Sequence, residues 1–356
     1  MKRVLSLLFL LLFAMPAWAG GPALQRGVNL SHWLQDDGRQ KVTAEDLALL
    51  RREGFDHVRL PLNPAYLGWI PEKPADLPRA DVLKAAMALV MASELDLVLD
   101  LHLDDQFKAK LEKDESLEPA VITLWQELAR LAAAFPSGKV AFELMNEPQY
   151  YGANAGKHWW AFQAQLAAAA RAAAPGRLLL LTGPQGGDVA TLVQAPPPDK
   201  EAAYVFHFYQ PYIFTHQGAE WMADDKRTAA ASMHDLPYPA EKVSAIPEGR
   251  AAAEVARYRA DKWNALRIRQ SVDQAAGWAH WNNVRIICTE FGVLRTHVDE
   301  VSRYAWIADT RRSLESLGIG WTVWDYADIF GIAAGTPRQL DEAARQALGL
   351  GRGRGE

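Results

Sequence analysis

The 356-residue sequence contains a single cysteine, Cys288, so no disulfide can form within the chain. Its net charge is only −5 at pH 7, and it has no basic face of the kind that a nucleic-acid partner requires. After the N-terminal segment, no apolar run is long enough to cross a membrane. The protein must therefore fold around an apolar core, in which Cys288 is expected to be a buried, unreactive thiol.

The one long apolar run lies at the start of the chain. Lys2 and Arg3 precede the apolar residues 4–13, and Ala17-Trp18-Ala19 follows as a small-x-small cleavage site. This order is typical of a signal peptide, so we expect residues 1–19 to be removed and the protein to be secreted, into the periplasm or the medium. A membrane anchor is the alternative, but the run is short for a bilayer and we expect no stable membrane insertion.

Short apolar segments alternate with longer helical patterns through the rest of the chain. Several of the short segments are apolar on both faces, as parallel strands covered by helices are. Eight such βα units predict a single (β/α)8 TIM barrel, of the α/β class, over residues 20–348. An open doubly wound sheet is the alternative, but no glycine-rich phosphate loop follows the first strand. The expected strands are 27–30, 57–60, 95–101, 140–144, 177–182, 203–208, 284–289 and 319–324.

The expected helices have recognisable ends. Thr43 is placed to cap a helix that Gly54 ends, and Asp81 is placed to cap the helix 82–94. The last eight residues, 349–356, are predicted to form a disordered tail.

One connection is unusually long. Residues 210–283 separate the sixth and seventh strands, with one helix expected at about 251–276. Long insertions at the C-terminal face of a barrel usually shape the active site, so we expect this segment to lie beside the mouth.

Polar residues follow the ends of several predicted strands, where barrel enzymes place their chemistry. Two of them, Glu147 and Glu290, each close an apolar segment, where an acidic side chain costs desolvation unless it is paired or used. Hydrolysis of a glycosidic bond needs such a pair, a proton donor and a nucleophile or base. Alone, each glutamate is equally well explained as an ion-paired structural carboxylate. The other polar and aromatic residues at strand ends are Arg59, His102, Asn146, His207, Tyr209 and Trp324.

These motifs, in this order, resemble glycoside hydrolase family five, whose barrel glycosidases share an Asn-Glu-Pro acid/base motif. The resemblance covers nearly the whole chain after the signal peptide. The motifs that carry it are Arg26-Gly27-Val28-Asn29-Leu30, Arg59-Leu60-Pro61, Asp100-Leu101-His102, Asn146-Glu147-Pro148, His207-Phe208-Tyr209, Thr289-Glu290-Phe291-Gly292 and Trp324-Asp325-Tyr326.

The resemblance implies the roles of the central residues. Glu147 would be the acid/base and Glu290 the nucleophile of a retaining hydrolase, and Asn146 would hydrogen-bond the sugar 2-hydroxyl. Arg59 would hold Glu290 ionised. Two carboxylates about 5 Å apart resist being charged together, so we expect the pKa of Glu147 to be the raised one.

Further residues are expected to support the site or bind substrate. By the same resemblance, Tyr209 would contact Glu290, His207 would lie close to Glu147, His102 would bind sugar hydroxyls or support that network, and Trp324 would form a platform under the sugar. Aromatic faces suit pyranose stacking. We therefore count Trp33 and Trp221 among the substrate-binding residues, together with Asn29.

The substrate is suggested by one loop. Residues 214–221 read Phe-Thr-His-Gln-Gly-Ala-Glu-Trp and resemble the loop after the sixth strand in bacterial endoglucanases of the family. We therefore expect internal cleavage of a β-1,4-glucan by a monomeric enzyme whose partner is a polysaccharide or oligosaccharide. Mannan, xyloglucan and β-1,3-glucan remain alternatives, because the family contains enzymes for each.

Two other classes of protein compete with this interpretation. A metal-dependent barrel hydrolase is one, since His102-Leu103-Asp104-Asp105 offers ligand types, but no zinc-type spacing follows and we expect neither a metal nor a cofactor. A non-catalytic polysaccharide-binding protein is the other, although both carboxylates are present. Inhibition by a chelator would support the first, and binding without cleavage would support the second.

Overall fold

The computed structural model describes residues 21–35, 40–152, 154–225 and 228–351. The predicted signal peptide therefore lies outside the described residues. Within these ranges, no helix has both the length and the apolar character needed to span a bilayer.

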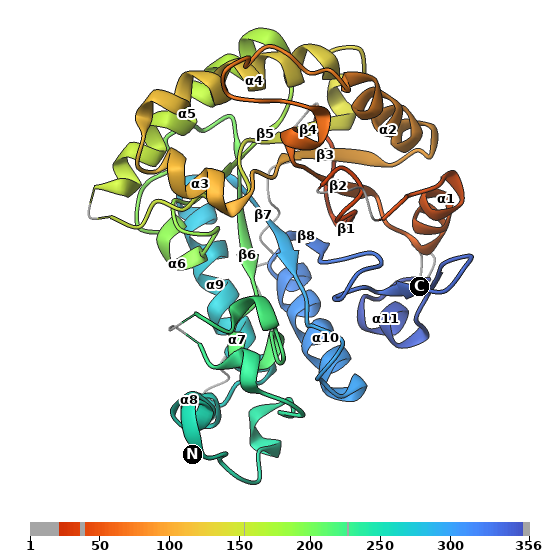
Figure 1. Cartoon of the computed structure of the whole chain (residues 1–356). Coiled ribbons are helices and arrows are strands. Elements are labelled where there is room, and N and C mark those ends of the chain that lie inside the picture. The colour runs from red at the N-terminus through yellow and green to blue at the C-terminus, as the bar shows by residue number, and fades with distance from the viewer. Residues whose placement is uncertain (1–20, 36–39, 153, 226–227, 352–356) are drawn as a thin grey trace, which may run out of the picture.

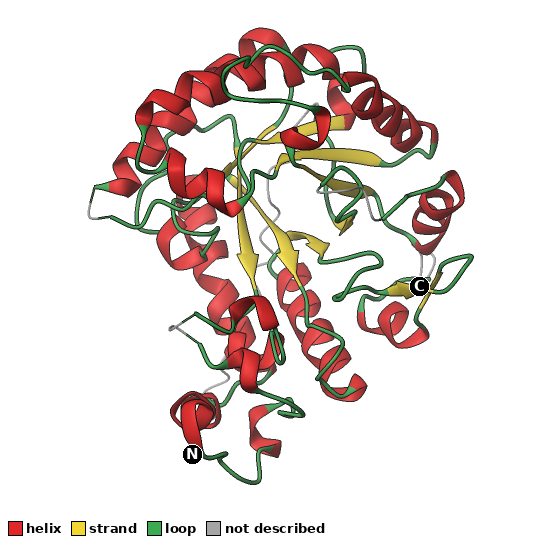
Figure 2. Ribbon diagram, viewed as in Figure 1, coloured by secondary structure: helices red, strands yellow, loops and turns green. Residues whose placement is uncertain are grey.

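Eight parallel strands close into a barrel in the order β1 to β8, with β8 pairing back onto β1 (Figure 1). Helices form a layer around the outside of the strands (Figure 2), so both faces of the sheet are covered. The predicted (β/α)8 fold is confirmed. The strands are β1 (Arg26–Asn29), β2 (His57–Leu62), β3 (Asp96–Leu101), β4 (Val140–Glu143), β5 (Leu179–Thr182), β6 (Ala203–Phe208), β7 (Arg285–Phe291) and β8 (Gly320–Val323).

The helices follow the strands, and a short hairpin packs near the C-terminus. The α-helices are α1 (Ala44–Glu53), α2 (Ala80–Ala92), α3 (Asp105–Leu111), α4 (Glu118–Ala132), α5 (Ala155–Ala173), α6 (Val189–Leu192), α7 (Tyr212–Thr215), α8 (Ala252–Ala260), α9 (Ala265–Asn282), α10 (Glu300–Ser316) and α11 (Glu342–Ala347), and the hairpin is β9 (Ala333–Ala334) with β10 (Gln339–Leu340). Short 3-10 helices cover Pro64–Leu67, Glu115–Leu117, Ser137–Lys139, Glu220–Met222, Ala230–Ser232, Ala240–Lys242 and Gly249–Ala251.

Helix ends follow local chemistry, with one exception to the predictions. Thr43 caps α1 in a reciprocal box with Asp46, and Gly54 ends that helix with φ 100°, both as predicted. The predicted Asp81 cap of α2 is wrong. The helix begins at Ala80, and its N-cap residue is Arg79, which makes no side-chain hydrogen bond to the helix. Asp81 lies in the first turn, where its negative charge interacts favourably with the helix dipole.

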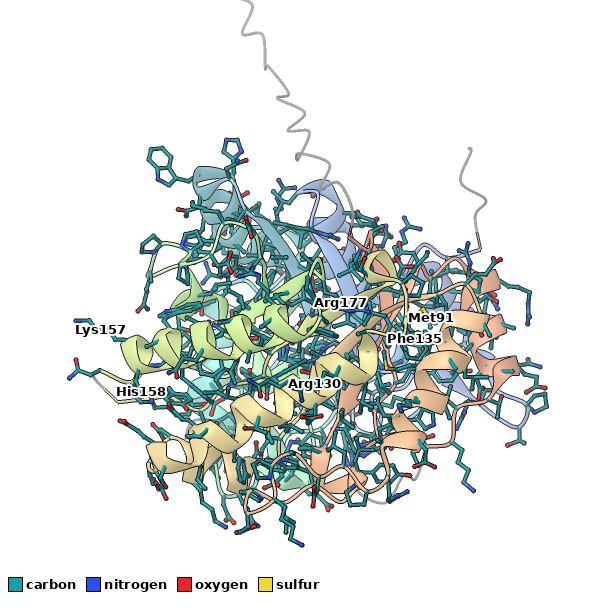
Figure 3. All side chains as sticks on the ribbon, turned by 90° about the horizontal axis from the view of Figure 1, so that it is seen from above. Met91, Arg130, Phe135, Lys157, His158 and Arg177 are labelled. Carbon is teal, nitrogen blue, oxygen red and sulfur yellow. The ribbon has the colours of Figure 1, made fainter. Side chains whose placement is uncertain are left out.

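A buried arginine also donates hydrogen bonds at one helix end. Arg177 lies against Phe135 beyond the C-terminal end of α4 (Figure 3). Its guanidinium donates to the carbonyls of Ala132, Phe135 and Pro136, at and just beyond the last residue of α4. This contact ties the segment before β5 to α4.

In the insertion between β6 and β7, the stretch predicted as one helix forms two, α8 and α9. Asn264 separates α8 from α9, because its side chain accepts hydrogen bonds from the amides of Leu266 and Arg267 and so starts a new helix. The preceding Lys262 has a left-handed φ of 52°.

The first residues of the predicted tail, 349–351, pack against the fold. Leu350 is buried, its amide donates to Arg345, and the Gly349 carbonyl accepts from the Arg26 side chain. Residues 352–356 lie outside the described residues.

Two apolar regions form the core. One fills the inside of the barrel with side chains such as Val98, Val205 and Ile287. The other lies between strands and helices and contains Cys288, which is fully buried and free. The predicted burial of Cys288 is confirmed, and burial raises the pKa of its thiol well above the ordinary value, as expected for an unreactive cysteine.

Candidate active site

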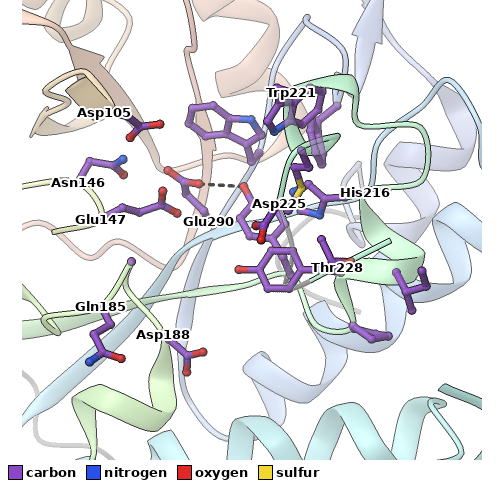
Figure 4. A pocket seen from close by; sticks show the side chains of 18 of the residues that line it. Asp105, Asn146, Glu147, Gln185, Asp188, His216, Trp221, Asp225, Thr228 and Glu290 are labelled. Carbon is purple, nitrogen blue, oxygen red and sulfur yellow. Dashed lines mark hydrogen bonds between the residues drawn. The ribbon is translucent and has the colours of Figure 1, made fainter. Parts of the chain in front are cut away.

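Glu147 and Glu290 meet at the C-terminal mouth of the barrel. They line a cavity of about 1130 Å³, and in Figure 4 both side chains lie beside Asn146 in the same space. Carboxylate oxygens of the two glutamates and a ring nitrogen of His207 all lie within 4.8 Å of one another. The predicted pair is therefore brought together.

Local backbone irregularities position both carboxylates. Glu147 has φ 44°, a left-handed conformation that non-glycine residues adopt rarely and that tends to occur at functional sites. On β7 the pairing with β6 slips by one residue, so that His207 lies opposite Glu290 although Phe206 pairs with Cys288. Such a bulge redirects side chains next to active sites, and here the consecutive residues Thr289 and Glu290 both reach the polar cluster, Thr289 at Glu143 and Glu290 at Arg59.

A close backbone contact holds the end of β7. A Cβ atom at Gly292 would lie 2.2 Å from the carbonyl oxygen of Trp324, so only glycine permits this approach. The contact brings the Trp324 side chain to the cavity wall, where it stacks on His102 with ring planes 18° apart.

Arg59 lies at the centre of the site, fully buried beneath the cavity. Its Nη1 donates to Glu290 Oε1 at 2.8 Å, as predicted. The same guanidinium binds Glu143 in a bidentate pair at 2.8 and 2.9 Å, and its Nη2 lies 3.1 Å from Asp100 Oδ2. Burial opposes the charge, but the three carboxylates outweigh it and raise the pKa of Arg59 well above the ordinary value.

Glu143 and Asp100 were missed in the sequence analysis. Both are fully buried acids on inward positions of β4 and β3. The sequence contained a signal for both. Asp100 belongs to the motif Asp100-Leu101-His102, and Glu143 lies just before Asn146-Glu147-Pro148. Each also places a charge in an apolar strand, where a charged side chain requires a partner.

The other oxygen of Glu290 is also held. Tyr209 donates its hydroxyl to Glu290 Oε2 at 2.8 Å, the bond drawn as a dashed line in Figure 4. His207 Nδ1 lies 2.8 Å from Glu147 Oε1 and 3.5 Å from Glu290 Oε2, so it bridges the pair. The predicted placements of Tyr209 beside Glu290 and of His207 beside Glu147 agree with these contacts.

The expected order of the two carboxyl pKa values is reversed in the unliganded site. The Glu290 side chain is only 6% exposed, and burial raises its pKa despite the nearby charges of His207 and Arg59. The Glu147 side chain is 37% exposed. Burial opposes its ionisation too, but the hydrogen bond and charge of His207 prevail and lower its pKa. The expectation failed because Arg59 shares its charge among three acids, while His207 was not counted as a cation.

Of the predicted substrate-binding residues Asn29, Trp33 and Trp221, only Trp221 lines the cavity. Asn29 is fully buried, donates to the carbonyls of Thr289 and Val323, and accepts from Arg59 at 2.9 Å. It thus supports Arg59 and does not line the cavity, and Trp33 is likewise absent from the described lining and packs against the core. Trp221 does line the cavity and is 59% exposed. The structure therefore places Asn29 and Trp33 behind the described cavity wall, and only Trp221 of the three on it.

The cavity extends well beyond the two carboxylates. Its walls include residues that no sequence signal identified, among them Tyr151 and Tyr258, the latter on α8 of the insertion. His216 of the 214–221 loop also lines it, and burial lowers the pKa of this histidine to about 4, so it is neutral. The insertion thus lies beside the mouth, as expected from its position in the chain.

The cluster of Glu147, His207 and Glu290 also has ligand types that suit a metal ion. Both oxygens of Glu290 are already engaged, one by the Arg59 cation and one by Tyr209. A metal ion here would face that guanidinium, so the charge arrangement favours proton sharing within the cluster over metal coordination.

A closed (β/α)8 barrel with paired glutamates at the ends of β4 and β7, one of them held by a buried arginine, defines a barrel glycoside hydrolase. The family model of cellulase, glycosyl hydrolase family 5, matches residues 18–328, and the chain belongs to this family.

Named relatives agree with this assignment. Endoglucanase 3 of Fibrobacter succinogenes is 27% identical over 356 residues, covering 92% of this chain but only 53% of that protein, so the chain spans about half of its length. Endoglucanase C of Acetivibrio thermocellus is 26% identical over 327 residues, covering 85% of this chain and 91% of the relative. A crystal structure of a hyperthermophilic endo-β-1,4-glucanase in complex with substrate has the same fold, with TM-score 0.75, 23% identity, and coverage of 92% of this chain and 97% of that one.

Proposed function

We propose that this protein is a secreted, monomeric, retaining endo-β-1,4-glucanase. The observation that carries the proposal is the closeness of Glu147 and Glu290, whose oxygens lie within 4.8 Å. Retaining glycosidases hold their two carboxyl groups about 5–5.5 Å apart, whereas inverting enzymes need about 6.5–9.5 Å to admit a water molecule. The spacing therefore supports a double displacement.

In the first step, the ionised Glu290 attacks the anomeric carbon while Glu147 protonates the leaving oxygen, so the glycosidic bond breaks and a glycosyl-enzyme forms. Glu147 then takes a proton from water, which attacks the same carbon and releases Glu290. Arg59 and Tyr209 orient both oxygens of the nucleophile throughout. His207 holds a proton at Nδ1, 2.8 Å from Glu147, and can deliver it when substrate displaces water from the mouth.

Internal cleavage is supported by the size and lining of the cavity. Its volume of about 1130 Å³ exceeds the roughly 300–1,000 Å³ of sites for small molecules. Tyr151, Tyr212 and Trp221 line it and are all at least 42% exposed, so aromatic faces are available beyond the point of cleavage. These features suit several consecutive sugars of one chain.

The β-1,4-glucan specificity is supported by the relatives, which are named endoglucanases, and by the 214–221 loop. His216 of that loop packs edge-on against Tyr209, with ring centroids 5.1 Å apart, so the loop is attached directly to a residue that contacts the nucleophile.

The proposal is tested by measuring reducing-end release from a soluble β-1,4-glucan, for example carboxymethylcellulose beside uncharged hydroxyethylcellulose. The mature protein should release reducing ends, and Glu290→Ala should not. Azide added to Glu290→Ala should restore bond cleavage and give a glycosyl azide, because a small anion can occupy the place of the lost carboxylate. Glu94→Ala, at an exposed turn before β3, is the control for a removed glutamate.

The anomeric configuration of the product tests whether the mechanism is retaining. Proton NMR during the first minutes should show the β-anomer of the new reducing end, as retention requires. An α-anomer would overturn the double displacement. Absence of cleavage on both glucans would overturn the glucanase assignment and would direct the same assay to mannan, xyloglucan and β-1,3-glucan.

A further inference from the structure

Asp100 occupies a position that the mechanism above does not use. It lies at an inward position of β3 and is fully buried. One of its oxygens, Oδ2, lies near two nitrogens, Arg59 Nη2 at 3.1 Å and His102 Nδ1 at 2.8 Å. Its other oxygen, Oδ1, has no hydrogen-bond partner among the described residues.

His102 connects this carboxylate to the site. Its Nε2 lies 3.2 Å from Asn146 Nδ2, so the ring bridges Asp100 and Asn146. Burial and the charge of Arg59 lower the pKa of His102 to about 3, so the ring is neutral and carries a single proton. Which nitrogen carries that proton decides whether His102 donates to Asn146 or accepts from it.

The orientation of the Asn146 amide follows from Arg59. Asn146 Oδ1 lies 2.8 Å from Arg59 Nη2, and a guanidinium can only donate, so the amide oxygen must face the arginine. The amide nitrogen then faces His102 and donates one hydrogen to Nε2. The second hydrogen of that nitrogen remains for the cavity, which Asn146 lines.

The hydrogen bonds on the two sides of His102 require the same tautomer of its ring. If Nε2 accepts from Asn146, the proton of the neutral ring is on Nδ1, and Asp100 Oδ2 is the acceptor that holds it there. We infer that Asp100 is a positioning residue, which fixes the tautomer of His102 and thereby holds the Asn146 amide as a hydrogen-bond donor toward the sugar 2-hydroxyl. The inference rests on the proposed function for its ligand, the 2-hydroxyl at the cleaved bond.

Two substitutions separate this role from a simple charge effect. Asp100→Asn removes the charge but can keep an oxygen at the place of Oδ2, with its amide nitrogen at the unpartnered position of Oδ1. Asp100→Leu removes both the charge and the acceptor at similar size. If Asp100 acts only as a counter-ion of Arg59, both variants should behave alike. If it fixes the His102 tautomer, the asparagine variant should retain the effect that the leucine variant loses.

The kinetic readout is selectivity for the 2-hydroxyl. It is the ratio of kcat/KM for an aryl β-cellobioside to that for its analogue without the 2-hydroxyl on the sugar at the cleaved bond. We expect this ratio to fall about tenfold or more in Asp100→Leu and to stay within about threefold of the wild type in Asp100→Asn, since the 2-hydroxyl contact strengthens in the transition state. Asp96→Asn, a buried carboxylate at the other end of β3 that pairs with Lys139, should leave the ratio unchanged.

The tautomer itself is observed by long-range ¹⁵N–¹H correlation of the histidine rings, with His102→Gln identifying the signals. Nδ1 should carry the proton in the wild type and in Asp100→Asn, and Asp100→Leu should show protonated Nε2. Equal loss of selectivity in both variants, or an unchanged tautomer in Asp100→Leu, would overturn the inference. A wild-type protein that does not cleave the cellobioside would instead count against the proposed function, and the NMR experiment would still decide the role of Asp100.

Discussion

At the scale of single residues, His207 lies between the two proposed catalytic carboxylates, 2.8 Å from Glu147 and 3.5 Å from Glu290. Burial opposes the charge of this ring, but Glu290 and the hydrogen bond to Glu147 outweigh that effect and raise the pKa of His207 above its ordinary value. A protonated His207 would lie between the two carboxylates and hold the proton that the proposed acid catalysis needs. In the proposed mechanism, this is how a partly exposed Glu147 with a lowered pKa acts as an acid.

The pH profile should reveal this sharing. In the wild type, the Glu147–His207 pair loses its last proton only as the pH rises through the raised pKa of His207, so the alkaline limb of kcat/KM lies above that residue's ordinary range. In His207→Gln, the proton must stay on Glu147 alone, whose ordinary pKa is lower. We expect the alkaline limb to move to lower pH by on the order of one unit. An unmoved limb would show that His207 does not hold the proton.

Glu143 contributes to the stability of the fold through its contact with Arg59. It forms the bidentate pair with Arg59 inside the barrel, where both side chains are fully buried. We expect Glu143→Gln to lower the free energy of unfolding by about 3 kcal/mol, since breaking a buried pair leaves a charge undercompensated. Urea denaturation measures the loss. Glu127→Gln on α4 breaks a surface pair with Arg130 and should cost under about 1 kcal/mol. Equal losses in the two variants would contradict this prediction.

At the scale of elements, the insertion between β6 and β7 builds one wall of the cavity. The 3-10 helix Glu220–Met222 presents Trp221, which packs near Phe330 with ring centroids 6.4 Å apart, and α8 contributes Tyr258. In the proposed function, the barrel supplies the reacting groups, and the insertion supplies surface that long substrates reach and short substrates do not.

Trp221→Ala should therefore affect polymer more than short substrates. We expect KM for a soluble β-1,4-glucan to rise up to about tenfold with little change in kcat, if stacking on the Trp221 ring is worth about 0.5–1.5 kcal/mol, as it is between two aromatic rings. Activity on an aryl cellobioside should change less. Trp281→Ala is the matched control, since Trp281 is 88% exposed on α9 and does not belong to the described cavity lining. Equal effects of the two substitutions would argue against a binding role for Trp221.

At the scale of the whole molecule, the fold is stabilised without a disulfide by a core on both sides of the barrel wall. This suits the proposed export, because folding outside the cytoplasm would not depend on oxidation. We expect the protein expressed with its full N-terminus in a bacterial host to be recovered outside the cytoplasm with Gly20 as its first residue. Mass spectrometry of the intact protein checks the cleavage site. A full-length chain retained in the membrane fraction would support an anchor.

The sequence by itself determined the strands, the barrel and the two glutamates that meet at its mouth. Apolar runs report burial on both faces of a strand, and motifs such as Asn146-Glu147-Pro148 are contiguous, so both signals are local. The capping of α1 by Thr43 was predictable for the same reason, since the partner Asp46 is three residues away.

Only the tertiary structure decided which side chains of the site form hydrogen bonds and ion pairs with one another. Arg59 lies 84 residues from Glu143 and 231 from Glu290, and no local pattern says that one guanidinium will serve both. The burial of Asn29, the role of His207 as a cation and the resulting order of the carboxyl pKa values depend on the same long-range contacts. Electrostatic energies are set by distance and solvent exposure, which exist only once the barrel has closed.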